Sequence, residues 1–196
     1  MSDEDRLQSW LEENYKSLIL GLLIGLSILY GYKTYISDRN LSQLALSREY
    51  DIAITAYKNG KTDLILEYSQ KNIINHPNNI YTNLSNLYSA KIMYEQNKFN
   101  DAYIYLDHII KESEDDDIRN IAIYRKSKIL IDDGKYKEAH TILDSSKNYQ
   151  HIELKGDLYV LEGDYVSAIN NYKDVLTFSI TPNERKNIIS KINLIK

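Results

Sequence analysis

The chain carries four histidines, the side chains best suited to metal binding or acid–base catalysis near neutral pH. These are His76, His108, His140 and His151. They form no short metal-ligand pair, and the chain has no cysteine to complete a zinc site. The sequence also has no Gly-rich phosphate loop, nucleophile elbow or kinase signature. We therefore expect no enzyme activity, no metal site and no cofactor, and we interpret the histidines as structural.

Charge gives two further exclusions. The acidic run from Glu112 to Asp117 could attract a cation, but it lacks the alternating ligands and the turn glycine of a calcium loop. We interpret it as a solvated loop between helices. The formal net charge of −4 also argues against a nucleic-acid surface, which is usually basic. The remaining class of function is protein binding.

A repeated pattern indicates the elements that would position a binding surface. Residues 97–106, 134–143 and 163–172 align without gaps, and a fainter copy surrounds Gly60. The three gapless copies each have a turn residue, an aromatic two residues later and an alanine three residues after that. The copy around Gly60 keeps only the turn and the small residue before it. All four copies have a small residue seven before the turn: Ala53, Ala90, Ser127 and Gly156 in chain order. The small residues allow two helices to cross closely, and the aromatic fills the wedge between them, as in tetratricopeptide repeats.

The spacing of the turns predicts how the repeats are built. The turns at 60, 97, 134 and 163 are separated by 37, 37 and 29 residues, against about 34 in the usual repeat. We expect an all-α solenoid of about four helix pairs, closed by a capping helix from Glu184 to Lys196. The long spacings predict extended loops between repeats, including Lys111–Asp117. The short spacing predicts a tight connection near Lys147–Gln150.

The concave face of such a solenoid is where we expect partners to bind. It is built from first-helix side chains that point away from the packing seam. The candidates are Tyr50, Ile54, Tyr57, Leu87, Lys91, Tyr94, Tyr124, Lys128 and Ile131. An aromatic floor with paired ammonium groups suits an extended peptide or the acidic segment of a partner. The alternative, that some of these Tyr and Ile residues belong to the ordinary core, stays open.

The chain begins with a different element. Ser17 to Tyr32 holds no charge in 16 residues, and Lys16 and Lys33 flank it. An acidic leader and the absence of a small-x-small cleavage site argue against a cleaved export signal. We therefore predict a short acidic N-terminal segment at 1–16, a transmembrane anchor at 17–36 and the repeat domain at 37–196.

Within the predicted anchor, Ser17, Gly21 and Gly25 recur every four residues, a stripe that allows close approach of another membrane helix. The alternative is that glycine is simply common in membrane helices. Orientation stays open at this point, because the basic residues on the two sides of the span are nearly balanced.

The arrangement resembles a known family over essentially the whole chain. The features are "ENYKSL" at Glu13–Leu18, a span with Gly21 and Gly25 that ends in Gly31-Tyr32, and a doubled Gly-Asp pair within Leu154–Leu176. The chain is similar to the YfgM family, the ancillary subunits of the bacterial SecYEG translocon. It departs from the family at Tyr32, where members tend to place Trp.

The resemblance implies a single-pass protein of the bacterial inner membrane, with a cytoplasmic N terminus and a periplasmic repeat domain. It also implies association with SecYEG and the chaperone PpiD, contact with nascent exported chains, and help in handing over newly translocated proteins. One alternative is a cytoplasm-facing anchored scaffold for another membrane complex. A third is a soluble assembly protein whose N-terminal helix does not span a membrane.

Overall fold

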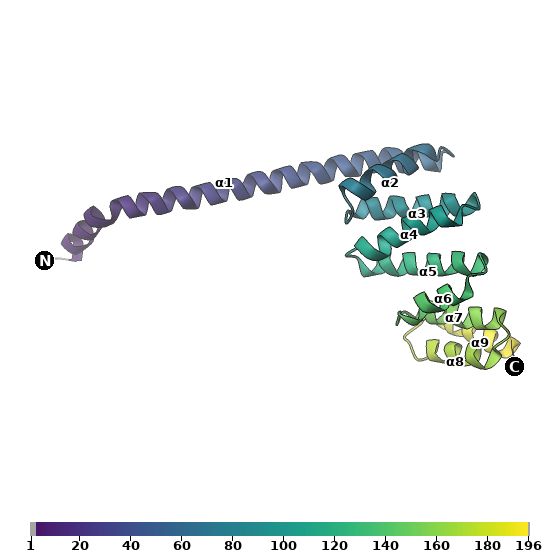
Figure 1. The fold of residues 1–196 in the computed structure, drawn as a ribbon. Coiled ribbons are helices and arrows are strands. Elements are labelled where there is room, and N and C mark those ends of the chain that lie inside the picture. The colour runs from purple at the N-terminus through teal and green to yellow at the C-terminus, as the bar shows by residue number, and fades with distance from the viewer. Residues whose placement is uncertain (1–2, 196) are drawn as a thin grey trace. The chain divides into compact units, whose positions relative to one another are not determined.

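The computed structural model describes residues 3–195, which form nine α-helices and no β-strand (Figure 1). The helices are α1 (Asp3–Lys58), α2 (Asp63–Asn75), α3 (Ile80–Glu95), α4 (Phe99–Glu112), α5 (Asp116–Asp132), α6 (Tyr136–Asp144), α7 (Tyr149–Leu161), α8 (Tyr165–Val175) and α9 (Pro182–Leu194). The chain divides into two compact units, with the boundary between Glu49 and Tyr50. The all-α class is therefore confirmed.

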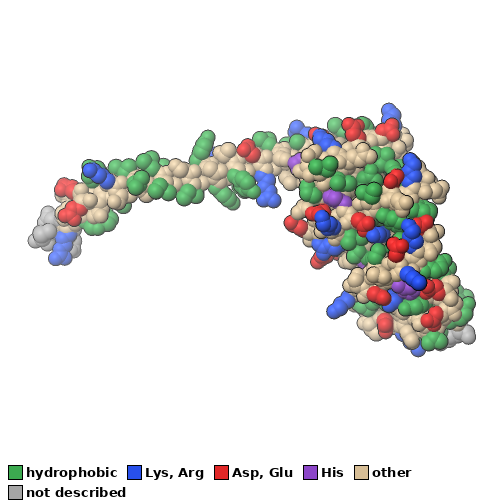
Figure 2. All heavy atoms as spheres, viewed as in Figure 1, with side chains coloured by type: hydrophobic (Ala, Val, Ile, Leu, Met, Phe, Trp, Pro, Cys, Tyr) green, Lys and Arg blue, Asp and Glu red, His purple; other side chains and the backbone are tan. Residues whose placement is uncertain are grey.

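The first unit consists of most of α1, a helix of 56 residues. Its described side chains from residue 6 to residue 45 are exposed or half-exposed, and hydrophobic side chains follow it along its length (Figure 2). The helix is long and apolar enough to cross a membrane, which agrees with the predicted anchor. It continues without a break through residues 36 and 37, where the sequence predicted a domain boundary.

The second unit contains four helix pairs, and the same turn closes each pair. Gly60, Asn97, Gly134 and Gly163 all have a left-handed backbone, with φ of 58–80°. At Asn97, the amide of Asn97 donates to the carbonyl of Tyr94 at 2.9 Å, and the amide of Lys98 donates to the carbonyl of Met93 at 2.8 Å. The other three turns repeat both hydrogen bonds, which define a Schellman motif. The predicted turn positions are confirmed.

Close crossings hold the two helices of a pair together. Ala90 and Ser127 are at most 1% exposed, as are the repeat alanines Ala102, Ala139 and Ala168. In the last pair Gly156 takes the small position, and the ring of Tyr172 packs directly on it. A Cβ atom on Gly156 would lie 2.6 Å from Cε1 of Tyr172. The small residues therefore act as the repeat pattern predicts.

The first helices of successive repeats lie next to one another: α3 packs on α5, and α5 packs on α7. Each begins at a side chain that accepts a hydrogen bond from the first turn: Asn79, Asp115 and Asn148 respectively. The last helix, α9, begins with a capping box between Thr181 and Glu184. This helix confirms the predicted cap and starts two residues earlier, at Pro182.

The prediction of long loops between the repeats is wrong. Only residues 113–115 separate α4 from α5, because Asp115 caps α5 and two further acidic residues, Asp116 and Asp117, form its first turn. Carboxylates are favourable there, since they meet the unpaired amides and the positive end of the helix dipole. The extra residues of the long repeats lengthen the helices: α3 has 16 residues and α5 has 17, whereas α6 has nine.

Candidate interaction groove

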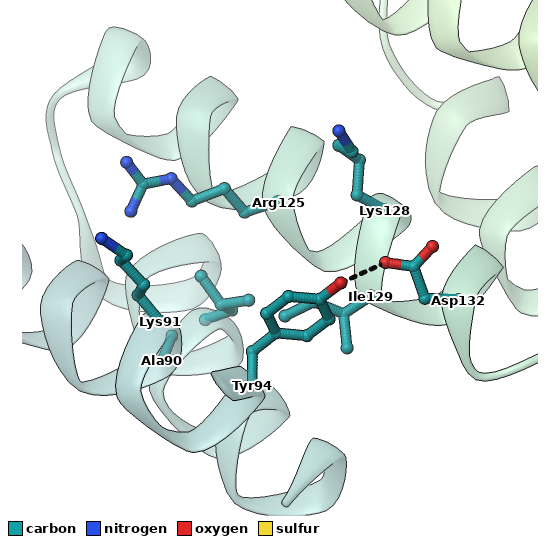
Figure 3. Close-up of a pocket in the computed structure, with 8 residues that line it drawn as sticks. Ala90, Lys91, Tyr94, Arg125, Lys128, Ile129 and Asp132 are labelled. Atoms are coloured by element: carbon teal, nitrogen blue, oxygen red, sulfur yellow. Dashed lines mark hydrogen bonds between the residues drawn. The ribbon is translucent and has the colours of Figure 1, made fainter. Parts of the chain in front are cut away.

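A groove of about 330 Å³ lies between α3 and α5, on the face formed by the first helices (Figure 3). We call it the α3–α5 groove. Its lining residues are Ala90, Lys91, Tyr94, Leu106, Arg125, Lys128, Ile129 and Asp132. All belong to α3 and α5 except Leu106, which α4 contributes from below.

The floor of the groove is apolar and fixed. Ala90, Leu106 and Ile129 are 1%, 0% and 6% exposed. Ala90 is the small residue of its repeat, so the close crossing of α3 and α4 also sets the depth of the groove. Side chains in such a core change position little, because the packing leaves them few alternatives. The floor is therefore a preformed apolar contact surface.

A polar pair links the two helices at one end of the groove. The hydroxyl of Tyr94 on α3 donates to Oδ2 of Asp132 on α5 at 2.7 Å (Figure 3). The same hydrogen bond, followed by the charge of Asp132, raises the pKa of Tyr94. The ring of Tyr94 also lies 5.8 Å from the ring of Phe99, centroid to centroid. Asp132 is therefore already engaged by a donor within the protein.

Three cationic side chains surround the rest of the groove. Lys91 comes from α3, while Arg125 and Lys128 come from α5, and all three are exposed. In Figure 3 the ends of Lys91 and Arg125 point to the same side, and Lys128 points elsewhere. A hydrogen bond to the Tyr57 hydroxyl is the largest of the effects that raise the pKa of Lys91. The groove is therefore lined by three positive charges and one carboxylate.

Three of the nine predicted binding residues meet in this groove: Lys91, Tyr94 and Lys128. Ile54 and Leu87 are instead buried, at 8% and 6% exposed, and belong to the core. Leu87 packs in the core cluster that contains Ala90 and Ala102.

The other predicted aromatic residues are half-buried and pack on neighbouring rings. Tyr50 lies 5.4 Å from Tyr81, and Tyr57 lies 5.0 Å from Tyr88, between ring centroids. Tyr124 stacks near His151 at 6.3 Å. Burial, followed by nearby Tyr88 and Asp51, raises the pKa of Tyr50 to about 12. These rings help to hold the repeats together, and so does Ile131, which packs at the edge of a core cluster.

Arg125 and Asp132 are lining residues that the sequence analysis missed. Arg125 donates to the carbonyl of Leu87, and Asp132 accepts from Tyr94; both contacts join residues 38 positions apart. The predicted candidates on α5 stand 37 residues after those on α3, as Tyr124 does after Leu87, so they fall one residue short of these contacts. The signal was present, since Arg125 stands three residues before Lys128 and shares its helix face.

None of the four histidines lines the groove, and three of them have side-chain partners inside the protein. Both ring nitrogens of the buried His151 are bonded, one to the Ser146 hydroxyl and one to the Asn120 carbonyl. His108 contacts the amide of Asn86, and His140 contacts Glu162. Within the described residues, no group of three His or acidic side chains could hold a metal ion.

The three residues of the predicted packing stripe, Ser17, Gly21 and Gly25, are exposed on α1. A Cβ atom on either glycine would meet nothing within 4 Å. The stripe is therefore accessible along the helix.

Comparisons with known proteins agree with this architecture. The sequence model of a tetratricopeptide repeat-like domain matches residues 8–195. Three similar proteins are each named ancillary SecYEG translocon subunit. The one from Haemophilus influenzae is 26% identical, over 86% of this chain and 84% of its own length. The one from Buchnera aphidicola of Acyrthosiphon pisum is 28% identical, over 94% of this chain and 96% of its own length. The one from Buchnera aphidicola of Schizaphis graminum is 30% identical, over 65% of this chain and 68% of its own length. This chain of paired helices and an N-terminal apolar helix belongs to the YfgM family of tetratricopeptide repeat-like proteins, the ancillary SecYEG translocon subunits.

Proposed function

We propose that this chain is a membrane-anchored interaction protein that associates with the SecYEG translocon of the bacterial inner membrane. Its N terminus lies in the cytoplasm and its solenoid lies in the periplasm. One combination carries the proposal: relatives named as translocon subunits match most of the chain, and α1, which leads into the repeats, has an uncovered apolar segment.

The solenoid acts by binding protein segments. We propose that its partners are PpiD and newly translocated proteins, and that binding assists the hand-over of exported chains to folding factors. The α3–α5 groove supports this role, because a rigid apolar floor edged by charged side chains suits a peptide better than a reacting small molecule. The function requires no catalytic group, metal or cofactor.

The orientation can be tested with paired reporters fused after residue 196. Alkaline phosphatase is active only in the periplasm, and green fluorescent protein fluoresces there poorly when exported unfolded. The proposal predicts high phosphatase activity and low fluorescence. The opposite pair of results would place the solenoid in the cytoplasm and favour the scaffold for another membrane complex.

Association with the translocon can be tested by affinity purification of the tagged full chain from detergent-solubilised membranes. We expect SecY, SecE and PpiD to co-purify at levels well above those seen with an unrelated single-pass protein that carries the same tag. If none of them is enriched, the association does not hold for this chain.

A further inference from the structure

We propose that the α3–α5 groove binds an acidic protein segment, one in which side-chain carboxylates alternate with apolar residues. This deepens the proposed function, on which it rests for the idea that the solenoid binds protein segments. It specifies the chemical class of the bound segment and the three cations that bind its carboxylates, Lys91, Arg125 and Lys128.

The groove is more positive than the chain as a whole. The whole chain has a net charge of −4, yet the groove is lined by three cations and one carboxylate, Asp132, which the Tyr94 hydroxyl already engages. Among the described residues, no carboxylate lies within 4.0 Å of Arg125 or Lys128, and Lys91 has only Glu95 at 3.7 Å. Elsewhere on the solenoid, lysines such as Lys126 and Lys155 hold much closer carboxylates. The groove therefore retains positive charge that a ligand can use.

Arg125 is held in place by a contact with α3. Its Nη1 donates to the carbonyl of Leu87 at 3.1 Å, so one arm of the guanidinium fixes the side chain against α3. The remaining N–H groups are left to bind in the planar fork that matches a carboxylate. Leu87 stands one helical turn before Lys91, and Figure 3 shows the ends of Arg125 and Lys91 pointing to the same side. Both side chains line the groove, and one carboxylate of the bound segment is assigned to them.

The positive charges are spread along the groove. Lys128 points away from the Lys91–Arg125 pair, while its ammonium group lies 5.9 Å from the ring centre of Tyr124. Cations separated in this way suit successive carboxylates along a segment better than a single terminal carboxylate. The apolar floor between them accepts the intervening side chains. Asp132, at the other end from Arg125, repels a carboxylate there and so sets the direction of the segment.

The inference can be tested by fluorescence anisotropy with the full chain in detergent. The probe is a fluorescein-labelled, C-terminally amidated peptide of three Gly-Asp-Leu units. Two matched peptides replace Asp with Asn, one of them amidated and one with a free terminal carboxylate. We expect the acidic peptide to bind at least tenfold more tightly than both, with affinity falling as salt rises.

Variants of the protein locate the site. Arg125→Gln combined with Lys128→Gln should weaken binding of the acidic peptide about tenfold or more. Arg125→Lys should weaken it less, because lysine keeps the positive charge and loses only the paired N–H groups of the guanidinium. The control combines Lys137→Gln with Lys173→Gln, two exposed lysines of α6 and α8, and should bind as the unmodified chain does. Circular dichroism checks that all variants remain folded.

Three outcomes would overturn the inference: equal binding of the neutral peptides, an unchanged affinity in the Arg125 and Lys128 double variant, or binding abolished by inorganic phosphate at a few millimolar. Co-purification of the same variants with SecYEG separates the two proposals. Loss of acidic selectivity with retained co-purification refutes only the chemistry of the groove, whereas selective binding without co-purification refutes the translocon association.

Discussion

Individual small residues determine how closely the helices of this solenoid approach. The second and third pairs combine Ala90 or Ser127 with a leucine 16 positions later, and the fourth combines Gly156 with Tyr172. Where the first helix has no side chain, at Gly156, the second helix carries a larger side chain, Tyr172, in place of leucine. Tyr172 is further held by a hydrogen bond from its hydroxyl to Oδ1 of Asp157 at 2.7 Å, so its ring has little room to move.

Gly156→Ala is expected to destabilise the solenoid. The added Cβ would lie 2.6 Å from the Tyr172 ring, and overpacking of this kind costs about 1–3 kcal/mol, more than the roughly 1 kcal/mol that Ala gains over Gly within a helix. Urea unfolding followed by circular dichroism measures the effect. Adding Tyr172→Leu should restore part of the loss, and Gly31→Ala, which meets open space within a helix, should not destabilise the chain. Equal stability of Gly156→Ala and the unmodified chain would refute this packing account.

His151 should make stability fall in acid. Burial lowers the pKa of His151 in the folded protein, and the hydrogen bond with the Asn120 carbonyl only partly opposes this. Below about pH 6.5 the unfolded chain therefore binds more protons than the folded chain. Stability is complete above that pH and decreases as the pH falls toward the folded pKa. The free energy of unfolding measured from pH 7 to pH 5 should drop, and less steeply in His151→Gln. If the free energy of unfolding falls just as steeply with pH in His151→Gln, His151 is not the source of the acid sensitivity.

At the scale of the elements, the sequence pattern determines the register better than the length of a helix. The aromatic and alanine positions located three turns, and the small residue seven before the turn located the fourth, at Gly60, because only a few residue types can occupy a close crossing. The ends of the helices were missed where capping decides them: Asp115 converts a run that looks like a solvated loop into the start of α5. Arg125 and Asp132 were missed because the contacts between α3 and α5 join residues 38 apart, a shift that packing sets.

The final helix should contribute stability through one face. Ile188 of α9 is 1% exposed and packs in the cluster with Tyr172 and Val175, whereas its neighbour Ile189 is 44% exposed. Ile188→Ala should cost about 2–4 kcal/mol, since it leaves a cavity, and Ile189→Ala should cost under about 1 kcal/mol. Chemical unfolding of the two variants compares them directly. Similar losses in both would show that α9 does not cap the stack.

The glycines of α1 give an element-scale prediction about the membrane. Gly21→Leu with Gly25→Leu should leave membrane insertion intact, because Leu is apolar and meets no neighbour along the helix. If the stripe packs on a partner helix, the double variant should co-purify with less SecYEG or PpiD, while Gly31→Leu should not. Undiminished recovery of the partners would identify the stripe as lipid-facing.

At the scale of the whole molecule, the two units have opposite surface character. The residues of α1 before Glu49 expose an apolar segment that no other described part of the chain covers, and the repeats from Tyr50 onward carry mixed charge over several apolar clusters. In the described residues of both units, no cluster of three His or acidic side chains could hold a metal ion. The division of labour we infer is anchorage by α1 and partner binding by the solenoid.

Site-specific photocrosslinking in living cells tests this account most directly. A benzoylphenylalanine probe replaces Tyr94 in the α3–α5 groove, and a matched probe replaces Val166, an exposed residue of α8 outside it. The account predicts that light produces adducts from position 94 that contain SecYEG components, PpiD or exported chains, and few from position 166. If these proteins are missing from the adducts at position 94, or if both positions give the same adducts, the groove is not where this protein meets its partners.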